Sequence, residues 1–245
     1  LQKEYPTKYR ELINKLNFHH EVENIREFNN LLYIPSPDTD TGLIEQFDGY
    51  FKLEDISVNE LKKRLIDPTE YLGGPNGIAV NTQVIKQADV VLMMSLFRDR
   101  FDYKVKSKNW EYYEKRTEHG SSLSQCIYAL VAAELGKTEL AYKYFMETAT
   151  IDITGKAKQY SGGLYIGGTH PAANGGAWMA AVMGFAGVRA AGDVLRLCPN
   201  LPGNWEMLSF SLNWRGQIYD IDISRESVRI FSAEENEAAG LFEVH

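Results

Sequence analysis

The sequence predicts a mainly helical chain that ends in a small antiparallel β module. Apolar residues recur at helical spacing from residue 4 to about residue 190, and a period of two replaces that spacing after Gly192. Helix pairs joined by long loops fit an α/α toroid better than a solenoid, because no repeat of solenoid length occurs. We therefore divide the chain into a helical portion, residues 1–191, and a β portion, residues 192–245.

The helical portion contains several segments with an apolar face or an apolar surface all round. The helices expected from this spacing are residues 4–17, 84–97, 123–135, 139–148 and 175–191. Ser122 and Thr138 are placed as N-caps of the third and fourth helices, and Gly136 ends the third. Residues 34–40 and 68–77 are rich in proline and small polar residues, which predicts loops.

The β portion begins where alternation of apolar and polar side chains replaces the helical spacing. Residues 210–214 alternate, Arg215 and Gly216 supply a turn, and residues 218–222 alternate again. This pattern is the signature of a β-hairpin. Residues 228–230 indicate one more strand beside it.

Composition and charge narrow the class of protein. The chain has 245 residues, 44% apolar and 24% charged, which is an ordinary balance for a globular protein. A net charge of -7 argues against a nucleic-acid partner, and no apolar run reaches membrane-spanning length. The two cysteines, Cys126 and Cys198, indicate neither a disulfide framework nor a metal site. We expect a cytoplasmic protein without a cofactor, and we interpret the start at Leu1, inside a helical pattern, as that of a fragment.

Lys86 and Gln87 open the apolar segment at residues 84–97. Burying an ammonium group costs several kcal/mol without partners, so Lys86 either reaches solvent or faces a polar cavity. An ammonium and a carboxamide suit the vicinal hydroxyls of a sugar, but a solvated first turn explains the pair equally well. Gln46, among the aromatic residues of segment 44–51, is open to the same two interpretations.

A second polar group precedes the third predicted helix and consists of His119, Gly120, Ser121 and Ser122. Backbone N–H groups and the helix dipole favour an anion at such a position, and the hydroxyls and the imidazole add donors. Helix capping by Ser122 alone is the simpler explanation.

A third group is the glycine-rich stretch at residues 164–178, which includes His170. Glycines allow a backbone to approach a ligand closely, and the proline after His170 holds that residue extended. His170 could therefore line a cleft, whereas the alternative is tight packing of the small-residue helix that follows.

Taken together, these segments resemble family 65 of the glycoside hydrolases, in the same order. The resemblance covers almost the whole chain, including the β module, and it is carried by residues 44–50, 84–91, 112–124, 132–136 and 175–187. The Lys-Gln-Ala-Asp-Val-Val run that begins at Lys86 is the most specific of them. That family consists mostly of inverting phosphorylases of α-glucosides, with some hydrolases. Its catalytic domain is an (α/α)6 barrel followed by a small C-terminal β domain.

The resemblance implies roles for the polar groups. Lys86 and Gln87 would contact the bound sugar, and we place Gln46 and His170 at the same sugar site. The phosphate site would consist of His119, Gly120, Ser121 and Ser122. The general acid of the family is a Glu in an Asp-Glu-Tyr or Asn-Glu-Tyr loop that this chain lacks. We therefore expect no catalytic residue within the chain, and we expect the acid upstream of Leu1.

Phosphorolysis is the reaction that this residue set favours. An inverting hydrolase needs an acid and a base, whereas phosphate is already anionic and attacks without a base. The resemblance thus implies a phosphorylase that takes an α-linked disaccharide or glucoside and inorganic phosphate, completed by its missing N-terminal half and homo-oligomeric at full length.

Two alternatives stay open. One is an inverting α-glucoside hydrolase of the same family, in which Glu118 would be the base. The other is a helical carbohydrate-binding domain without catalysis. If upstream helices are absent, the inner face of the half-barrel should be exposed or covered by another chain.

Overall fold

The computed structural model describes residues 2–67, 72–73, 77–154, 160–161, 164–165, 168–233 and 240–245. The chain forms two compact units, Leu1–Ser36 and Pro37–His245, and each is described here by itself. The predicted loop at residues 34–40 has neither helix nor strand, whereas most of the predicted loop at 68–77 lies outside the described residues. Within the described part of the chain, no helix combines the length and apolar character needed to cross a membrane.

The first unit is a pair of helices, α1 (Pro6–Leu16) and α2 (His19–Leu31). The helix predicted at residues 4–17 is confirmed as α1. Pro6 occupies its first turn, where the missing N–H costs nothing, and Asn17 ends it in the left-handed region with φ of 53°. The second helix was not predicted. Apolar side chains on both helices are exposed, and these include Leu12, Leu16, Ile25, Phe28 and Leu31.

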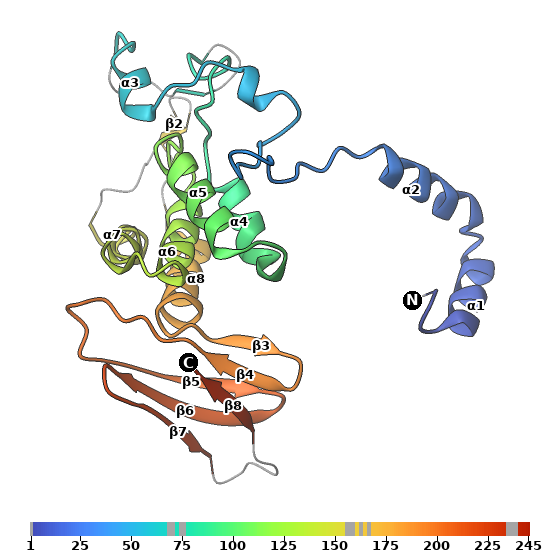
Figure 1. The fold of residues 1–245 in the computed structure, drawn as a ribbon, viewed down its shortest axis with the longest axis vertical. Helices are drawn as coiled ribbons and strands as arrows, with labels where there is room; N and C mark the ends of the chain where they lie inside the picture. The colour runs from blue at the N-terminus through green and yellow to red at the C-terminus, as the bar shows by residue number, and fades with distance from the viewer. Residues whose placement is uncertain are drawn as a thin grey trace. The chain divides into compact units, whose positions relative to one another are not determined.

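The second unit contains the rest of the helices (Figure 1). They are η1 (Tyr50–Lys52), α3 (Val58–Lys62), α4 (Asp89–Leu96), η2 (Arg98–Arg100), α5 (Tyr103–Glu114), α6 (Ser124–Glu134), α7 (Thr138–Ala149), α8 (Pro171–Met179) and the π-helix η3 (Ala180–Phe185). Two short strands, β1 (Tyr160–Ser161) and β2 (Leu164–Tyr165), also pair with each other in antiparallel fashion.

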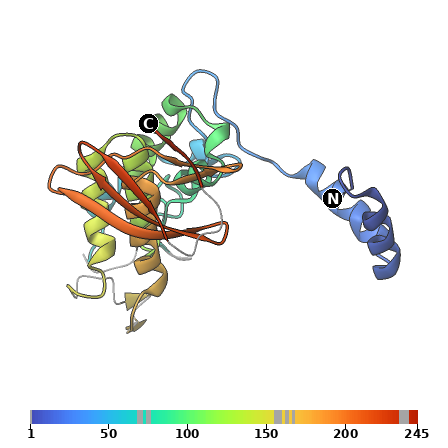
Figure 2. The same cartoon turned by 90° about the horizontal axis from the view of Figure 1, so that it is seen from below.

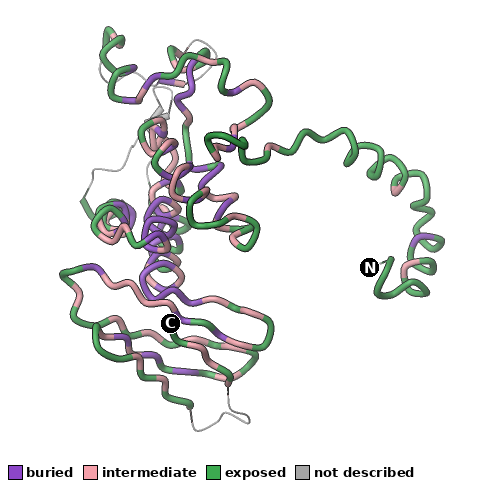
Figure 3. Tube along the Cα trace, viewed as in Figure 1, coloured by how far each residue is buried: buried purple, intermediate pink, exposed green. Residues whose placement is uncertain are grey.

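Helix α6 lies at the centre of the helical core, and its trace is largely buried in Figure 3. It is apolar on every side, as its sequence predicts for a helix with neighbours all round, and Tyr128, Ala129 and Ala132 are fully buried. Trp110 on α5 packs its ring against Tyr128 and donates a hydrogen bond to the Tyr128 carbonyl over 3.1 Å. This packing holds the helices that carry the polar groups in fixed positions.

Several predicted helix boundaries are wrong. Helix α4 begins at Asp89 rather than at residue 84, because the segment before it pairs its backbone with residues 116–120. Helix α6 begins at Ser124 with Leu123 as N-cap, so Ser122 does not cap it. Thr138, predicted as the N-cap of α7, is instead the first residue of that helix. Its N-cap is Lys137, and no side chain caps the helix within the described residues.

The extent of helix was also overestimated. Residues 32–49 and 77–88 contain no helix. The small-residue helix gives way to a strand, so the C-terminal sheets begin at Arg189 rather than after Gly192. The division of the chain at residue 191 stays a prediction.

The C-terminal strands form two three-stranded sheets. The predicted hairpin is confirmed as β5 (Met207–Trp214) and β6 (Gln217–Ser224), joined by Arg215 and Gly216 at φ of 54° and 81°, and β7 (Val228–Ser232) is the predicted third strand. The other sheet has the order β3 (Arg189–Ala191), β4 (Val194–Leu197), β8 (Leu241–Val244). Strands β4 and β8 run parallel, so the module is not wholly antiparallel as predicted.

The sheets lie at one end of the helices (Figures 1 and 2). Their core contains Leu195, Leu197 and Ile221, and η3 contributes Val182 to it. The neighbouring residue Phe185 of η3 belongs to the helical core instead. The π-helix therefore carries side chains that pack against both layers.

Two adjacent glycines of α8 allow a matched test of helix packing. A Cβ atom at Gly176 would lie 2.5 Å from Cys126 Sγ and 2.7 Å from Cys126 Cβ, whereas one at Gly175 would meet nothing within 4 Å. We expect Gly176→Ala to lower the free energy of unfolding by about 1–3 kcal/mol. Gly175→Ala should raise it by about 0.5–1 kcal/mol. Urea denaturation measures both, and equal effects would contradict the close contact between α6 and α8.

Candidate functional site

A short backbone ladder brings two of the predicted polar groups together. Ile85 N–H donates to the Arg116 carbonyl over 2.8 Å, and Glu118 N–H donates to the Ile85 carbonyl over 2.8 Å. Gly120 N–H donates to the Lys86 carbonyl over 3.0 Å. These amides thus find partners outside a helix. The ladder places Lys86 beside the segment that holds Gly120.

The side chains of Lys86 and Glu118 both approach Gly120. A Cβ atom at Gly120 would lie 3.4 Å from Lys86 Cγ and 3.1 Å from Glu118 Oε2. Glycine at this position therefore leaves room for both side chains. Lys86 is exposed. Of the two environments that the sequence allowed for its side chain, solvent or a polar cavity, the structure shows exposure at the protein surface.

Gln46 and Gln87 converge on the carboxylate of Asp89, the first residue of α4. Gln46 Nε2 donates to Asp89 Oδ2 over 2.5 Å, and Gln87 Nε2 donates to Asp89 Oδ1 over 3.0 Å. Sequence reasoning missed Asp89, although it lies within the Lys-Gln-Ala-Asp run. The signal that could have found it is its position three residues after Lys86.

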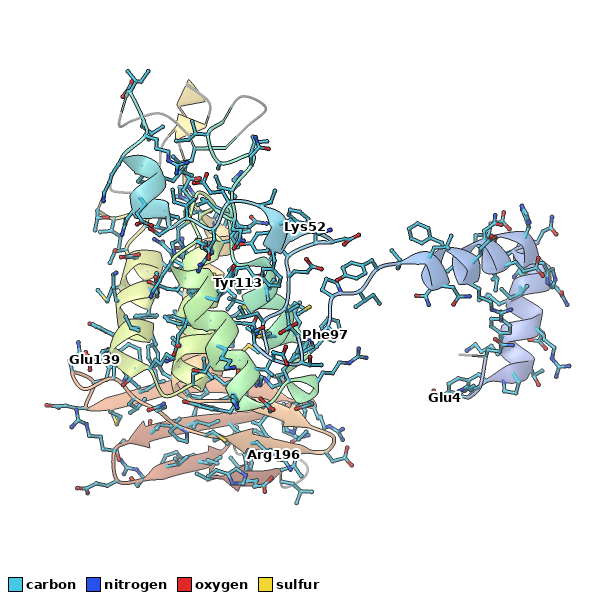
Figure 4. All side chains as sticks on the ribbon, turned by 45° about the horizontal axis from the view of Figure 1, so that its top comes forward. Glu4, Lys52, Phe97, Tyr113, Glu139 and Arg196 are labelled. Atoms are coloured by element: carbon cyan, nitrogen blue, oxygen red, sulfur yellow. The ribbon has the colours of Figure 1, made fainter. Side chains whose placement is uncertain are left out.

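The segment that carries Gln46 is anchored to α5, the helix that includes Tyr113 (Figure 4). Ile44 N–H donates to Asn109 Oδ1 over 2.8 Å, and the Tyr113 hydroxyl donates to the Ile44 carbonyl. Tyr113 and Ile44 are fully buried. Gln46 is therefore held two residues from a rigid anchor.

His119 turns its ring into the protein. Its backbone φ is 55°, and its ring lies 5.0 Å from the Tyr128 ring and 5.2 Å from the Tyr144 ring. Its Nδ1 atom lies 2.9 Å from Ser124 Oγ, and its Nε2 atom is buried without a hydrogen-bond partner within the described residues. Burial, with the nearby charge of Lys143, lowers the pKa of His119 from 6.5 to about 4. The imidazole is therefore neutral at pH 7.

The low pKa of His119 predicts an acid-sensitive contribution to stability. The unfolded chain takes up this proton near pH 6.5 and the folded chain near pH 4, so the contribution is complete above pH 6.5 and is lost as the pH falls towards 4. Between pH 7 and 4.5 this loss amounts to about 2 kcal/mol. His119→Asn, which tolerates a positive φ, should reduce the loss by that amount. Urea denaturation at both pH values measures it, and an unchanged pH dependence would disprove the shifted pKa.

Ser121 and Ser122 lie half-buried in the turn that enters α6. Leu123 N–H donates to Ser121 Oγ over 3.3 Å, and Ser124 N–H donates to the Ser121 carbonyl over 3.1 Å. Within the described residues no side chain caps α6. The positive end of the helix dipole is therefore not compensated by a cap.

His170 has its partners elsewhere in the second unit. Its Nδ1 atom lies 2.6 Å from Asp152 Oδ1, and its N–H donates to Asp152 Oδ2 over 2.8 Å. Asn174 Nδ2 donates to the same oxygen over 3.0 Å. These bonds fix the start of α8 to the turn that follows α7, so the bonds of His170 have a structural role. Its place at the sugar site stays a prediction.

Comparison with known proteins identifies related sequences along the whole chain. The model of the glycosyl hydrolase family 65 central catalytic domain matches residues 2–179, and that of the family's C-terminal domain matches residues 188–243. A nigerose phosphorylase from Lachnoclostridium phytofermentans is 45% identical over 92% of this chain and 30% of its own length. A 1,2-alpha-glucosylglycerol phosphorylase from Bacillus selenitireducens is 43% identical over 88% of this chain and 28% of its own length.

A solved structure is also similar. A putative kojibiose phosphorylase from the human microbiome matches with a TM-score of 0.78 and 25% identity, over 96% of this chain and 30% of that one. This chain thus spans about 30% of the length of the curated relatives that it matches.

Proposed function

This chain belongs to glycosyl hydrolase family 65, and from that membership we propose that it forms part of an inverting glycoside phosphorylase acting on α-glucosides. The observation that carries the proposal is the backbone ladder between Lys86 and Gly120. This ladder joins the segment of Lys86 and Gln87, which suits a sugar, to residues 119–122, which suit an anion. A phosphorylase must hold its two substrates, the glucoside and phosphate, side by side.

In the proposed reaction an oxygen of inorganic phosphate attacks the anomeric carbon of the glucoside. The bond from that carbon to the glycosidic oxygen breaks, and a general acid protonates the departing sugar. Because this nucleophile is already an anion, the segment at residues 119–122 needs to supply hydrogen-bond donors rather than a base. We propose that the acid lies in a part of the enzyme outside this chain.

The exposed apolar side chains of α1 and α2 support the same proposal. Leu31 is 77% exposed, and Ile25 and Phe28 are similarly open. Several large apolar side chains exposed on two successive helices are typical of an interface. We propose that the remainder of an (α/α)6 catalytic barrel covers it.

Lys86 supplies the test of the sugar site. Its ammonium group would donate to sugar hydroxyls, and the loss of hydrogen bonds to a charged group costs about 1.5–3 kcal/mol. We expect Lys86→Ala in the assembled enzyme to lower kcat/KM for the glucoside by roughly 10-fold to 100-fold. Lys104→Ala, at an exposed position of α5, is the control. An unchanged kcat/KM would count against a substrate role for Lys86.

The decisive experiment for the function is product analysis. The assembled enzyme is incubated with α-linked glucose disaccharides, with and without phosphate, and the products are identified by NMR. A sugar 1-phosphate of inverted anomeric configuration, formed only with phosphate, supports the proposal. Free glucose released at the same rate without phosphate would refute it.

The position of Glu118 keeps hydrolysis as a second candidate. Its Oε2 atom lies beside Gly120, where a carboxylate could activate water. Release of glucose without phosphate, abolished in Glu118→Gln, would establish that hydrolytic reaction.

A further inference from the structure

Two carboxamides from separate segments of the chain donate to one carboxylate. Gln46 precedes η1, Gln87 precedes α4, and each directs its Nε2 group to a different oxygen of Asp89. We propose that Asp89 is a positioning residue that orients both carboxamides toward a bound glucoside. This inference rests on the proposed function, since it concerns the sugar site of the same enzyme.

Asp89 can impose an orientation because of the chemistry of the two groups. A carboxamide has a donor end and an acceptor end of nearly equal shape, and its hydrogen bonds decide which end points where. An ionised carboxylate only accepts, so both NH2 groups must face Asp89. The Oε1 atoms of Gln46 and Gln87 therefore point away from it as acceptors.

The three segments involved are rigid enough to keep this orientation. Asp89 leads directly into the buried Val90 and Val91 of α4. Gln87 follows the ladder through Ile85, and Gln46 follows the fully buried Ile44. Movement of either carboxamide is therefore limited to its side chain.

The carboxamide oxygen of Gln46 remains available as a hydrogen-bond acceptor. Its Oε1 atom is buried and has no hydrogen-bond partner within the described residues. A buried polar atom without a partner is costly and calls for a ligand or a neighbour to satisfy it. A sugar hydroxyl that donates to Oε1 would satisfy it. The ammonium of Lys86, one residue before Gln87, would supply donors to the same ring of hydroxyls.

A simpler role for Asp89 is to stabilise the start of α4 through the helix dipole. That role predicts a loss of stability in the Asp89→Asn variant and no change in the kinetics of a folded enzyme. Glu139, exposed in the first turn of α7, provides the matched control because Glu139→Gln removes the same kind of charge elsewhere.

The kinetic test is a double-mutant cycle in the assembled enzyme. Asn at position 89 can accept from one carboxamide but presents its own NH2 group to the other. We expect Asp89→Asn to lower kcat/KM for the glucoside roughly tenfold, and Glu139→Gln to leave it unchanged. Gln87→Ala should cost roughly tenfold in the wild type and less than about threefold in Asp89→Asn. A folded Asp89→Asn enzyme with the wild-type kcat/KM would overturn the proposal. So would a double variant in which the effects of Asp89→Asn and Gln87→Ala on kcat/KM multiply as those of independent changes do.

A second measurement is made on the wild-type chain itself and needs no enzymatic activity. In 15N NMR spectra of the wild-type chain, the side-chain NH2 protons of Gln46 and Gln87 should exchange with water more slowly than those of an exposed glutamine such as Gln2. Gln46→Ala and Gln87→Ala assign the signals. Unprotected protons on both carboxamides would overturn the proposal even if the enzyme proves to be a phosphorylase. Protected protons in an enzyme without phosphorolysis would instead refute the proposed function alone.

Discussion

Replacing Glu134 with alanine is expected to lower the free energy of unfolding by about 3–5 kcal/mol. Glu134 closes α6, its side chain is 8% exposed, and its carboxylate faces three cations. Its oxygens lie 2.7 Å from Lys106 Nζ on α5, 3.2 Å from Arg98 Nη2 on η2 and 3.7 Å from Arg189 Nη2 on β3. Alanine would remove the carboxylate that pairs with all three of these positive charges.

An exposed ion pair provides the control for this prediction. Glu54 pairs with Arg64 over 2.5 Å, but both side chains are about half exposed. Such pairs contribute about 0–1 kcal/mol, so Glu54→Ala should have little effect. Thermal and urea denaturation of the chain measure both variants. If Glu134→Ala costs no more than Glu54→Ala, the cluster does not tie α6 to its neighbours.

Short sequence patterns correctly predicted the helices and turns that form between residues close together in the sequence. The hairpin at Arg215 and Gly216 follows from alternation and a two-residue turn, and both residues take the positive φ that the turn requires. Helix α6 follows from its apolar surface. The family resemblance added what spacing could not, namely that these helices and strands belong to one enzyme family.

Backbone pairing between residues far apart in the sequence is the part of the fold that apolar spacing did not predict. Residues 84–88 have helical apolar spacing, yet Ile85 bonds to Arg116 and Glu118, far away in the sequence. The parallel pairing of β4 with the chain's last strand is equally non-local, and the pattern of either strand alone does not reveal it. Apolar periodicity reports which side chains are buried, not which backbone groups pair.

The site was predicted as separate groups, and the structure supplies the connections between them. Sequence reasoning selected Lys86, Gln87 and Gln46 but missed the carboxylate of Asp89 that links the two carboxamides. It also counted the imidazole of His119 among the donors of an anion site without foreseeing its burial, because burial of a loop histidine beside Tyr128 and Tyr144 depends on helices that follow it in sequence.

Removing both hydroxyls in Ser121→Ala/Ser122→Ala is expected to weaken phosphate binding by the assembled enzyme about a hundredfold or more. Each hydrogen bond to a charged group contributes about 1.5–3 kcal/mol, and each 1.4 kcal/mol corresponds to a factor of ten in affinity. The positive end of α6, which no side chain caps within the described residues, would also favour the anion. The KM for phosphate should therefore rise strongly, while kcat at saturating phosphate changes less.

The stability of the double variant distinguishes a binding role from a structural one. Ser122 does not cap α6, and the bond from Leu123 N–H to Ser121 Oγ is long at 3.3 Å. We therefore expect the melting curve to shift by less than the loss of an N-cap, which costs about 1 kcal/mol. Ser211→Ala, on an exposed position of β5, is the matched control for the loss of a hydroxyl. An unchanged KM for phosphate in a stable double variant would show that neither serine hydroxyl binds phosphate, which would contradict the proposed site.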